Sequence, residues 1–313
     1  LGVSSDNFSN CVQMSSAPIS SNDNKTFTLD PYDNLTVGTT YLTRVTTGVK
    51  DASGNAMSSQ YENSNGFTTV SFQLQTKAEL QTAVDLWVSD KSSALSTYGE
   101  INTWDVSLIT DMSELFKDKS TFNDNISNWD VSSVTNMYRL FMNADDFSGD
   151  LSKWDVSSVT NMGSLFYDTK FNGDLSGWDV SNVTSFDSMF FSANSINNNS
   201  LANWDVSSTT NMRQMFYGAS TFNGDISGWD VSSVTNMRVM FSQTAINQDL
   251  SNWDVSSVTS MWGMFERARQ FDQDISSWDI SSVTDMTSMF SRANALSDAN
   301  KCLIHTDFDN NSN

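Results

Sequence analysis

Residues Phe122–Ala144 read Phe-Asn-Asp-Asn-Ile-Ser-Asn-Trp-Asp-Val-Ser-Ser-Val-Thr-Asn-Met-Tyr-Arg-Leu-Phe-Met-Asn-Ala, and this stretch decides the fold because close copies of it recur along the chain. The dipeptide Trp-Asp marks each copy. Its tryptophans are Trp104, Trp129, Trp154, Trp178, Trp204, Trp229, Trp253 and Trp278. In every copy Ser follows the tryptophan by three positions, Thr by six and Phe by twelve. A nearly constant period of about 25 residues is typical of proteins whose repeats stack on one another.

The first half of each unit has the spacing of a β-strand. Ile126, Trp129 and Val131 follow the leucine-rich-repeat pattern, which places Trp129 and Val131 on one face of the strand and Asp130 on the other. The pattern therefore predicts a parallel sheet that contains all eight tryptophans. The alternative is that the tryptophans form an exposed platform that stacks on sugars. The shared face with an aliphatic residue favours burial in the core.

The second half of each unit has the spacing of a short helix. Its apolar residues fall at i, i+3, i+4 and i+7, namely Met137, Leu140, Phe141 and Ala144. Thr135 and Asn136 precede them, where side-chain oxygens cap a helix N-terminus. Each unit is therefore predicted to be strand, turn, short helix and turn, so the fold class is a β-α solenoid with a parallel sheet, short helices and eight coils of about 25 residues.

The solenoid is expected to run from about Asn102 to Leu296. A helix within Ala78–Leu95 is predicted to cover its first coil. The predicted domains are an Ig-like domain at 1–70, the capping helix at 71–100, the repeats at 101–300 and a tail or incomplete cap at 301–313. In that tail, Lys301–Thr306 reads as a short apolar strand-like segment, and it leaves the last coil without a comparable cap.

Composition excludes some classes of protein. The chain has 313 residues, with 16 basic residues against 37 acidic ones and a net charge of −21. Nucleic-acid binders contact phosphates through Lys and Arg, so no nucleic-acid partner is expected. The charge suits a protein that is kept in solution by self-repulsion or that collects cations. No run reaches the roughly 18 apolar residues of a transmembrane helix, so no transmembrane segment is predicted.

The repeat Trp-Asp-Val-Ser-Ser-Val-Thr-Asn-Met resembles that of the BspA-like, mycoplasma-type surface lipoproteins, which belong with the leucine-rich repeats. The resemblance covers roughly Leu74 to Phe308, and Ala78–Trp87 resembles the helix that opens such arrays. The resemblance implies a protein on the bacterial cell surface or secreted from it, with adhesion as its inferred role. It supplies no catalytic residues.

The segment before the repeats, at 1–70, is predicted to be a different domain. Thr26–Pro31 and Gly38–Val45 read as alternating strands, and Lys50–Asn55 reads as a turn. With Gly66–Thr69 at its end, the segment resembles the bacterial Ig-like domain of surface-layer and adhesin proteins. Thr26 lies close to the start of the chain, so the opening strands of such a sandwich are expected to be missing.

A row of carboxylates is the candidate metal site. One aspartate follows each tryptophan, and these residues are Asp105, Asp130, Asp155, Asp179, Asp205, Asp230, Asp254 and Asp279. Like charges side by side are unfavourable, so something must compensate for them. One hypothesis is hydrogen bonding to neighbouring Ser, Thr and backbone N–H groups. The other is Ca²⁺ bridging adjacent coils, because oxygen ligands suit a hard cation. No other cofactor is required.

Two cysteines, Cys11 and Cys302, are too few for a disulfide framework or a zinc site. They flank the solenoid, and a disulfide needs Cα atoms within about 7 Å of each other. Either they are two buried thiols, or they form an intermolecular disulfide in an oxidising setting.

No catalytic motif is present, and the single histidine, His305, leaves little scope for acid–base catalysis. The chain is therefore predicted not to be an enzyme, and no catalytic residue is assigned. One function class is an extracellular adhesion or binding module for a protein or glycan ligand. The other is a structural subunit that assembles head-to-tail with copies of itself into a filament, sheath or surface layer. In both classes the protein is expected outside the cell or on its surface.

Overall fold

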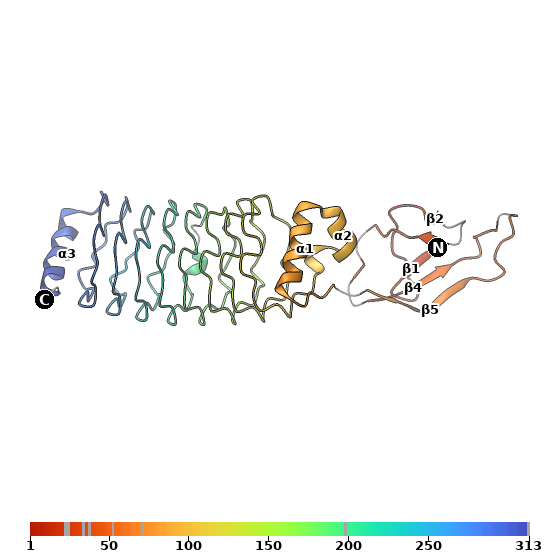
Figure 1. Cartoon of the computed structure of the whole chain (residues 1–313), viewed down its shortest axis with the longest axis horizontal. Coiled ribbons are helices and arrows are strands. Elements are labelled where there is room, and N and C mark those ends of the chain that lie inside the picture. The colour runs from red at the N-terminus through yellow and green to blue at the C-terminus, as the bar shows by residue number, and fades with distance from the viewer. Residues whose placement is uncertain are drawn as a thin grey trace. The chain divides into compact units, whose positions relative to one another are not determined.

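The computed structural model describes residues 1–21, 26–32, 35–36, 39–51, 53–69, 72–196 and 199–311. The chain divides into two compact units, Leu1–Phe72 and Gln73–Asn313. Figure 1 shows a sheet-containing first unit and a second unit of successive loops between helices.

The first unit is built on a three-stranded antiparallel sheet in the order β1-β4-β5. The strands are β1 (Gly2–Ser4), β4 (Thr40–Val45) and β5 (Tyr61–Thr68). A second antiparallel pair joins β2 (Ile19–Ser21) to β3 (Thr26–Thr28). The strand predictions at Thr26 and Tyr41 are thus confirmed. Gly38 and Ala52, which belong to the predicted strand and turn, lie outside the described residues.

The expectation that the opening strands are missing is wrong. Two short strands precede Thr26, and β1 pairs with β4 through the Val3–Thr43 register. The side chain of Val3 is buried, as is that of Tyr41 on β4. The prediction failed because a three-residue strand is too short to show an alternating pattern.

Two helices open the second unit in place of the single predicted one. They are α1 (Lys77–Ser89) and α2 (Lys91–Tyr98), followed by a 3₁₀ turn at Ile101–Thr103. Thr76 caps α1 by accepting from the N–H of Glu79, whose carboxylate accepts in turn from the N–H of Gln75. Trp87 of α1 packs edge-on against Trp104 at 5.7 Å between ring centroids. The helices therefore cover the first repeat, as predicted.

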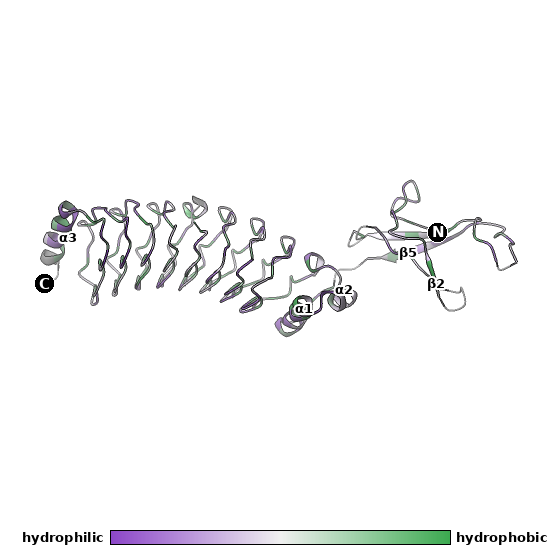
Figure 2. Cartoon of the chain, turned by 90° about the horizontal axis from the view of Figure 1, so that it is seen from above, coloured by the Kyte–Doolittle hydropathy of each residue, from purple (hydrophilic) through white to green (hydrophobic). Residues whose placement is uncertain are grey.

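The repeats lie side by side as successive loops, which Figures 1 and 2 show from two directions. We number them 1 to 8 from Trp104 to Trp278, and we number positions by their separation along the chain from the tryptophan. Isolated parallel bridges join every pair of neighbours at position 7, from Asp111–Asn136 to Ser260–Asp285. A 3₁₀ turn at Asn199–Leu201 occupies the longest repeat.

The parallel pairing does not lie where the sequence predicted it. The stretch from Ile126 to Val131 forms turns and extended backbone with no strand, and the pairing occurs at Asn136, seven residues beyond Trp129. Trp129 and Val131 are nevertheless buried. The spacing had identified the inward side chains correctly, but it did not identify the backbone segment that pairs.

The predicted helix is also absent, because tight turns occupy residues 138–143, between Met137 and Ala144. Its N–H groups alternate between two acceptors. Those of Met137, Arg139, Phe141 and Asn143 donate to carbonyls of the next repeat, and those of Leu140, Met142 and Ala144 donate three residues back. Arg139 and Asn143 both adopt a positive φ of 57°. This conformation repeats every four residues, so it places apolar residues at i, i+3, i+4 and i+7 as a helix would.

Aromatic side chains fill the interior of the repeats. The phenylalanines at position 12 stack along the array with ring centroids 5.3 to 5.9 Å apart. The eight tryptophans are all buried, which confirms the core assignment and rules out an exposed tryptophan platform. Large rings fill a short repeat with few residues, since each ring buries about 150–250 Å².

The last repeat is covered by α3 (Asp298–Asn311), so the predicted strand-like segment and missing cap are wrong. Ser297 accepts from the N–H of Asn300 at the start of this helix. Ile304 and Phe308, spaced one helical turn apart, are buried against the core. In a helix, residues four positions apart lie on the same side, so Ile304 and Phe308 together cover the apolar end of the array.

Candidate binding face

The residues that are identical in all eight repeats hold the repeats together. Each tryptophan from repeat 2 onward donates its Nε1–H to the main-chain carbonyl three residues before the preceding tryptophan, as Trp154 does to Ile126 at 3.2 Å. The threonine hydroxyl at position 6 donates to the corresponding carbonyl of the preceding repeat, as Thr160 does to Thr135 at 3.2 Å. These residues have structural partners, so they are not candidates for ligand binding.

The predicted row of aspartates is also tied to its own repeat. The Oδ1 atom of Asp179 accepts from the N–H and the hydroxyl of Ser181, at 3.0 and 2.6 Å. The hydroxyl bond, and then the N–H bond, hold the pKa of Asp179 below its ordinary value, although the charge of Asp155 opposes this. The same serine bonds recur at Asp105, Asp130, Asp155, Asp205, Asp230 and Asp254, and Asp279 keeps the N–H bond. The hydrogen-bonding hypothesis for this row is therefore confirmed.

The row does not supply the ligand set of a calcium site. Calcium takes six to eight oxygen ligands, whereas each aspartate here offers one oxygen that its serine leaves unbonded. Within the described ranges, no three His, Cys, Asp or Glu side chains are grouped closely enough to hold a metal ion. Calcium bridging therefore stays a prediction, and no role of the face depends on it.

Both cysteines are free and exposed, so the expectation of buried thiols is wrong. Cys302 lies on α3, and Cys11 lies in the first unit. An intermolecular disulfide stays a prediction. His305 is likewise exposed on α3.

Other positions vary from repeat to repeat, and they gather on one side of the array. Positions 9, 10, 13 and 14 lie in the turns that carry the inter-repeat hydrogen bonds and position 16 follows them, and we call these five positions the variable face. Position 9 is Ser, Tyr, Gly, Asp, Arg, Arg, Trp and Thr in repeats 1 to 8. Larger side chains at these positions are mostly exposed or half-buried. The face thus combines a rigid scaffold with a different surface on each repeat.

Three aromatic rings at position 13 form a row on the variable face. Tyr167 stacks on Phe191 at 4.3 Å and Phe191 on Tyr217 at 4.7 Å between ring centroids. All three are half-buried, which leaves ring surface in solvent. The phenol oxygen of Tyr217 accepts a 2.7 Å bond from the amide of Gln243 on the next repeat.

Two pockets open on this face, and they occupy equivalent positions. The aspartate pocket, of about 390 Å³, is lined by Asp145, Asp168, Thr169, Lys170, Ser192, Asn194 and Ser195. The arginine pocket, of about 310 Å³, is lined by Ser220, Gln243, Thr244, Ala245, Arg267, Arg269 and Gln270. Each pocket takes position 16 from one repeat, positions 14 to 16 from the next, and positions 14, 16 and 17 from the third.

Each pocket lies over a repeat that is one residue shorter than most. These are repeats 3 and 6, which run from Trp154 to the residue before Trp178 and from Trp229 to the residue before Trp253. The shortening falls just after position 15, which is Thr169 or Thr244, and the buried hydroxyl of Thr244 donates to the carbonyl of Phe241 at 2.7 Å. A shorter loop reaches less far out than its neighbours, so a hollow forms between them. The two short intervals between tryptophans are the sequence signal for the pockets, which the predictions from the sequence missed.

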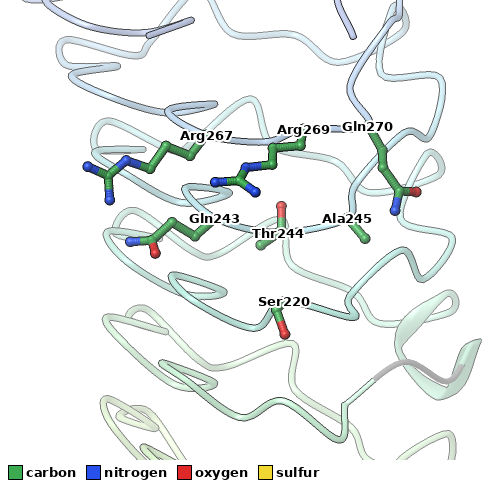
Figure 3. A pocket seen from close by; sticks show the side chains of 7 residues that line it. All are labelled: Ser220, Gln243, Thr244, Ala245, Arg267, Arg269 and Gln270. Atoms are coloured by element: carbon green, nitrogen blue, oxygen red, sulfur yellow. The ribbon is translucent and has the colours of Figure 1, made fainter. Parts of the chain in front are cut away.

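The two pockets differ in charge. In the aspartate pocket, Lys170 is paired with Asp146 at 3.0 Å, and two further carboxylates line the wall. The arginine pocket has two guanidinium groups and no acidic lining residue. Figure 3 shows Arg267 and Arg269 extending in the same direction above Gln243 and Thr244, with Ser220 on the repeat beyond.

Comparison with known protein families gives two matches. The family described as Mycoplasma protein of unknown function, DUF285, matches residues 87–202 and 191–301. A bacterial Ig-like domain family matches residues 3–73. No curated protein and no solved structure matches the chain. Among the helices that the structure describes, none is both long and apolar enough to cross a membrane.

Proposed function

The chain belongs to the family described as Mycoplasma protein of unknown function, DUF285, and we propose that it is a non-catalytic surface protein that binds an extracellular ligand through its variable face. In this proposal the repeats form a solenoid that acts as a rigid scaffold. The bacterial Ig-like domain supports a location on the cell surface or outside the cell. The ligand is a glycan or a protein.

One observation carries the proposal, namely the separation of invariant from variable positions. The invariant Trp, Asp, Ser, Thr and Phe residues bond or pack against their own array. The variable residues carry the aromatic row, the two pockets and most of the side-chain diversity. Tyr, Trp and Arg, which the variable face contains, are the residues that contribute most to binding energy at protein interfaces.

The test is binding of the whole chain to an array of extracellular glycans and matrix proteins. The variant Tyr167→Ser, Phe191→Ser, Tyr217→Ser removes the aromatic row, and we expect it to lose most of the binding. The control Ser158→Ala, Asn182→Ala, Ser208→Ala changes exposed position 4 of the same three repeats and should bind as the parent does. Equal binding by the parent and both variants would contradict the proposal.

The alternative function is a structural subunit that assembles with copies of itself, and the edge of repeat 8 supports it. In the described part of the chain, the N–H groups of Met286, Ser288, Phe290 and Arg292 have no acceptor. Their counterparts in the preceding repeats donate to the next repeat. An apolar cavity of about 450 Å³ also lies between α3 and this repeat. Open edges recruit strands, so filaments in electron micrographs of the purified chain would favour this function, and uniform monomers would reject it.

A further inference from the structure

Basic residues are distributed unevenly in this acidic protein. Between Trp204 and Ser297 the sequence has five basic residues, and all five are arginines on the variable face: Arg213, Arg238, Arg267, Arg269 and Arg292. The variable positions of these four repeats hold one acidic residue, Glu266. Solubility does not account for this local cationic surface, because the excess of acids on a chain of net charge −21 already provides it.

Two of the three arginines outside the pocket pair with carboxylates of other repeats, whereas inside the pocket Arg267 pairs only with its sequence neighbour Glu266, which does not line the pocket. Arg213 pairs with Asp187 at 3.5 Å, and Arg238 reaches Asp285 at 4.0 Å and lies over the Trp262 ring. Arg269 is exposed and has neither a hydrogen-bond nor an ion-pair partner among the residues that the structure describes. Two guanidinium groups are thus directed to a hollow that contains no carboxylate of its own.

Arg267 also has a hydrogen-bond donor without an acceptor. Its Nε atom is shielded from solvent and has no hydrogen-bond acceptor among the described residues. The nearest carboxylate oxygen, on Glu266, lies 3.6 Å away, which is too far for a hydrogen bond. A shielded donor without an acceptor is costly. The outer guanidinium nitrogens of Arg267 and Arg269 likewise have no hydrogen-bond acceptor among the described residues, and an anion in the pocket would supply one.

The remaining groups of the pocket suit a hydroxylated ligand. Gln243 and Gln270 bring amides to the wall, while Thr244 is committed to the Phe241 carbonyl. The amide nitrogen of Gln243 donates to the phenol of Tyr217, which fixes its orientation and leaves its oxygen to accept. The hydroxyl of Ser220 donates to Asn194 at 2.8 Å, so towards a ligand it acts as an acceptor.

An aromatic face lies beside these polar groups. The Tyr217 ring is half-buried, and its bond to Gln243 ties it to the pocket wall. Polar donors and acceptors next to an aromatic face match the hydroxyl groups and the apolar C–H face of a sugar ring. The pocket therefore combines groups for an anion with groups for a sugar.

We propose that the arginine pocket binds an acidic glycan, a short sugar chain that carries carboxylate or sulfate groups. The proposal names the ligand class of the variable face and therefore rests on the proposed function. Arg267 and Arg269 bind the anionic group through charge-assisted hydrogen bonds, and Gln243, Gln270 and Ser220 contact sugar hydroxyls. Arg292 occupies the same position as Arg267 in the next repeat. There it contacts a second anionic group of the glycan. A long, densely charged polyanion such as a nucleic acid is repelled by the remaining surface.

The test measures binding of the whole chain to four short probes by isothermal titration calorimetry. Sulfated chondroitin tetrasaccharide and unsulfated chondroitin tetrasaccharide separate sulfate from carboxylate recognition. Maltotetraose is the neutral sugar, and tetraglutamate is the acidic ligand without sugar. The titrations are done at physiological salt, where charges more than about 8 Å apart are screened. We expect at least one chondroitin probe to bind, and neither maltotetraose nor tetraglutamate to bind.

Two variants with the same change in charge locate the site. Arg267→Gln, Arg269→Gln removes the pocket guanidinium groups, and we expect Kd to rise about tenfold or more, since each lost charge-assisted bond weakens binding. Arg213→Gln, Arg238→Gln removes two arginines of the same face outside the pocket, and its Kd should stay within about threefold. Thermal unfolding of both variants verifies that they fold.

The outcomes separate this inference from the proposed function. An equal loss in both variants would show general electrostatic attraction and overturn the pocket assignment. Binding of tetraglutamate as tight as that of the sugars would overturn the glycan class. If no chondroitin probe binds while the aromatic-row variant still loses binding on the array, the ligand assignment fails and the variable face stands. If neither assay detects binding, both fail.

Discussion

The residues that recur in every repeat explain how neighbouring repeats are held against one another. The tryptophan at position 0 has two roles, since its ring is buried and its Nε1–H donates to the carbonyl three residues before the preceding tryptophan. The distance is 3.2 Å for Trp154 to Ile126 and 3.0 Å for Trp178 to Leu151. A phenylalanine at this position would fill most of the space but could not donate. The indole N–H therefore gives tryptophan a bond at this position that phenylalanine cannot make.

Replacing Trp154 by Phe tests this explanation. The Ile126 carbonyl would keep only its bond from the N–H of Trp129. The loss of the second, buried hydrogen bond costs about 1 kcal/mol, and the smaller ring would leave a cavity that adds to the cost. Urea unfolding followed by circular dichroism measures the loss. The control is Trp262→Phe, because Trp262 is only half-buried and no hydrogen bond of its indole nitrogen is described. Similar effects for the two variants would contradict the role of the buried bond.

The aspartate–serine bonds make stability depend on acid pH. The folded-state pKa values of Asp179, Asp205 and Asp254 are lowered below the ordinary 3.8, mainly by the serine hydroxyls. The unfolded chain therefore takes up protons first as the pH falls. The stabilisation is present above the ordinary value and is lost as the pH falls through the lowered values.

We expect the midpoint of thermal unfolding to fall between about pH 5 and about pH 2. Replacing Ser181 and Ser207 by Ala removes two of the hydroxyl donors and should make that fall smaller. The matched control changes the exposed Ser158 and Ser208 to Ala. A pH profile that is the same for the parent and the Ser181/Ser207 variant would count against this account.

At the scale of the element, the turn segment is the unexpected feature. Positions 10 and 14 adopt positive φ in every repeat, so the backbone reverses every four residues while its N–H groups alternate between two repeats. Most of these positions hold residues that tolerate the left-handed region poorly. The inter-repeat hydrogen bonds impose the conformation. Val239, a β-branched residue at φ 47°, is the most strained example.

Val239 also explains Gly263, its neighbour at position 10 of the next repeat. A Cβ added to Gly263 would lie 2.8 Å from the Cγ1 atom of Val239, and the φ of Gly263 is +61°. Gly263→Ala should therefore destabilise the chain by about 1–3 kcal/mol. The double variant Val239→Ala, Gly263→Ala should recover part of that loss, as measured by a double-mutant cycle in urea. Additive effects would show that the two residues do not compete for space.

The C-terminal helix α3 is the element that protects the last repeat. Ile304 is buried on it, whereas Leu303, one residue earlier, is exposed. Ile304→Asp places a carboxylate against the apolar core, and we expect the free energy of unfolding to fall by about 3 kcal/mol or more. Leu303→Asp is the matched control and should cost little. Light scattering of the Ile304 variant should also show self-association through the uncovered repeat, and a stable monomer would argue against the protective role.

At the scale of the whole molecule, acidic and basic side chains recur at different positions of the repeats. The aspartates form a regular row bonded to serines, while the arginines of repeats 5 to 8 occupy the variable face. Calcium could act only on the first of these. Because the row supplies too few ligands per repeat, we expect calcium at millimolar concentration to leave the unfolding temperature within about 1 °C of its value in chelator. A larger rise that the chelator reverses would support the calcium-bridging prediction.

The sequence by itself determined the repeats, their boundaries and their buried residues. The period of the tryptophans and phenylalanines can be read directly from the sequence. Their burial follows from this period, because apolar side chains on a short unit must share a core with the neighbouring unit. The helix that covers repeat 1 could also be predicted, because the hydrophobic spacing within Ala78–Leu95 places Leu80, Val84 and Trp87 on one side. The resemblance of the repeats was confirmed by the family match.

Only the tertiary structure decided the backbone path and the candidate site. The spacing of Met137, Leu140, Phe141 and Ala144 fits a helix and a four-residue turn equally well, and hydrogen bonds to the next repeat select the turn. The arginine pocket depends on how far one loop extends relative to the loops on either side. That relation exists only once the repeats stack, because Ser220, Gln243 and Arg267 come from three different repeats. The periodicity of the sequence predicts which side chains face the core, and the packing between repeats determines where a pocket forms on the surface.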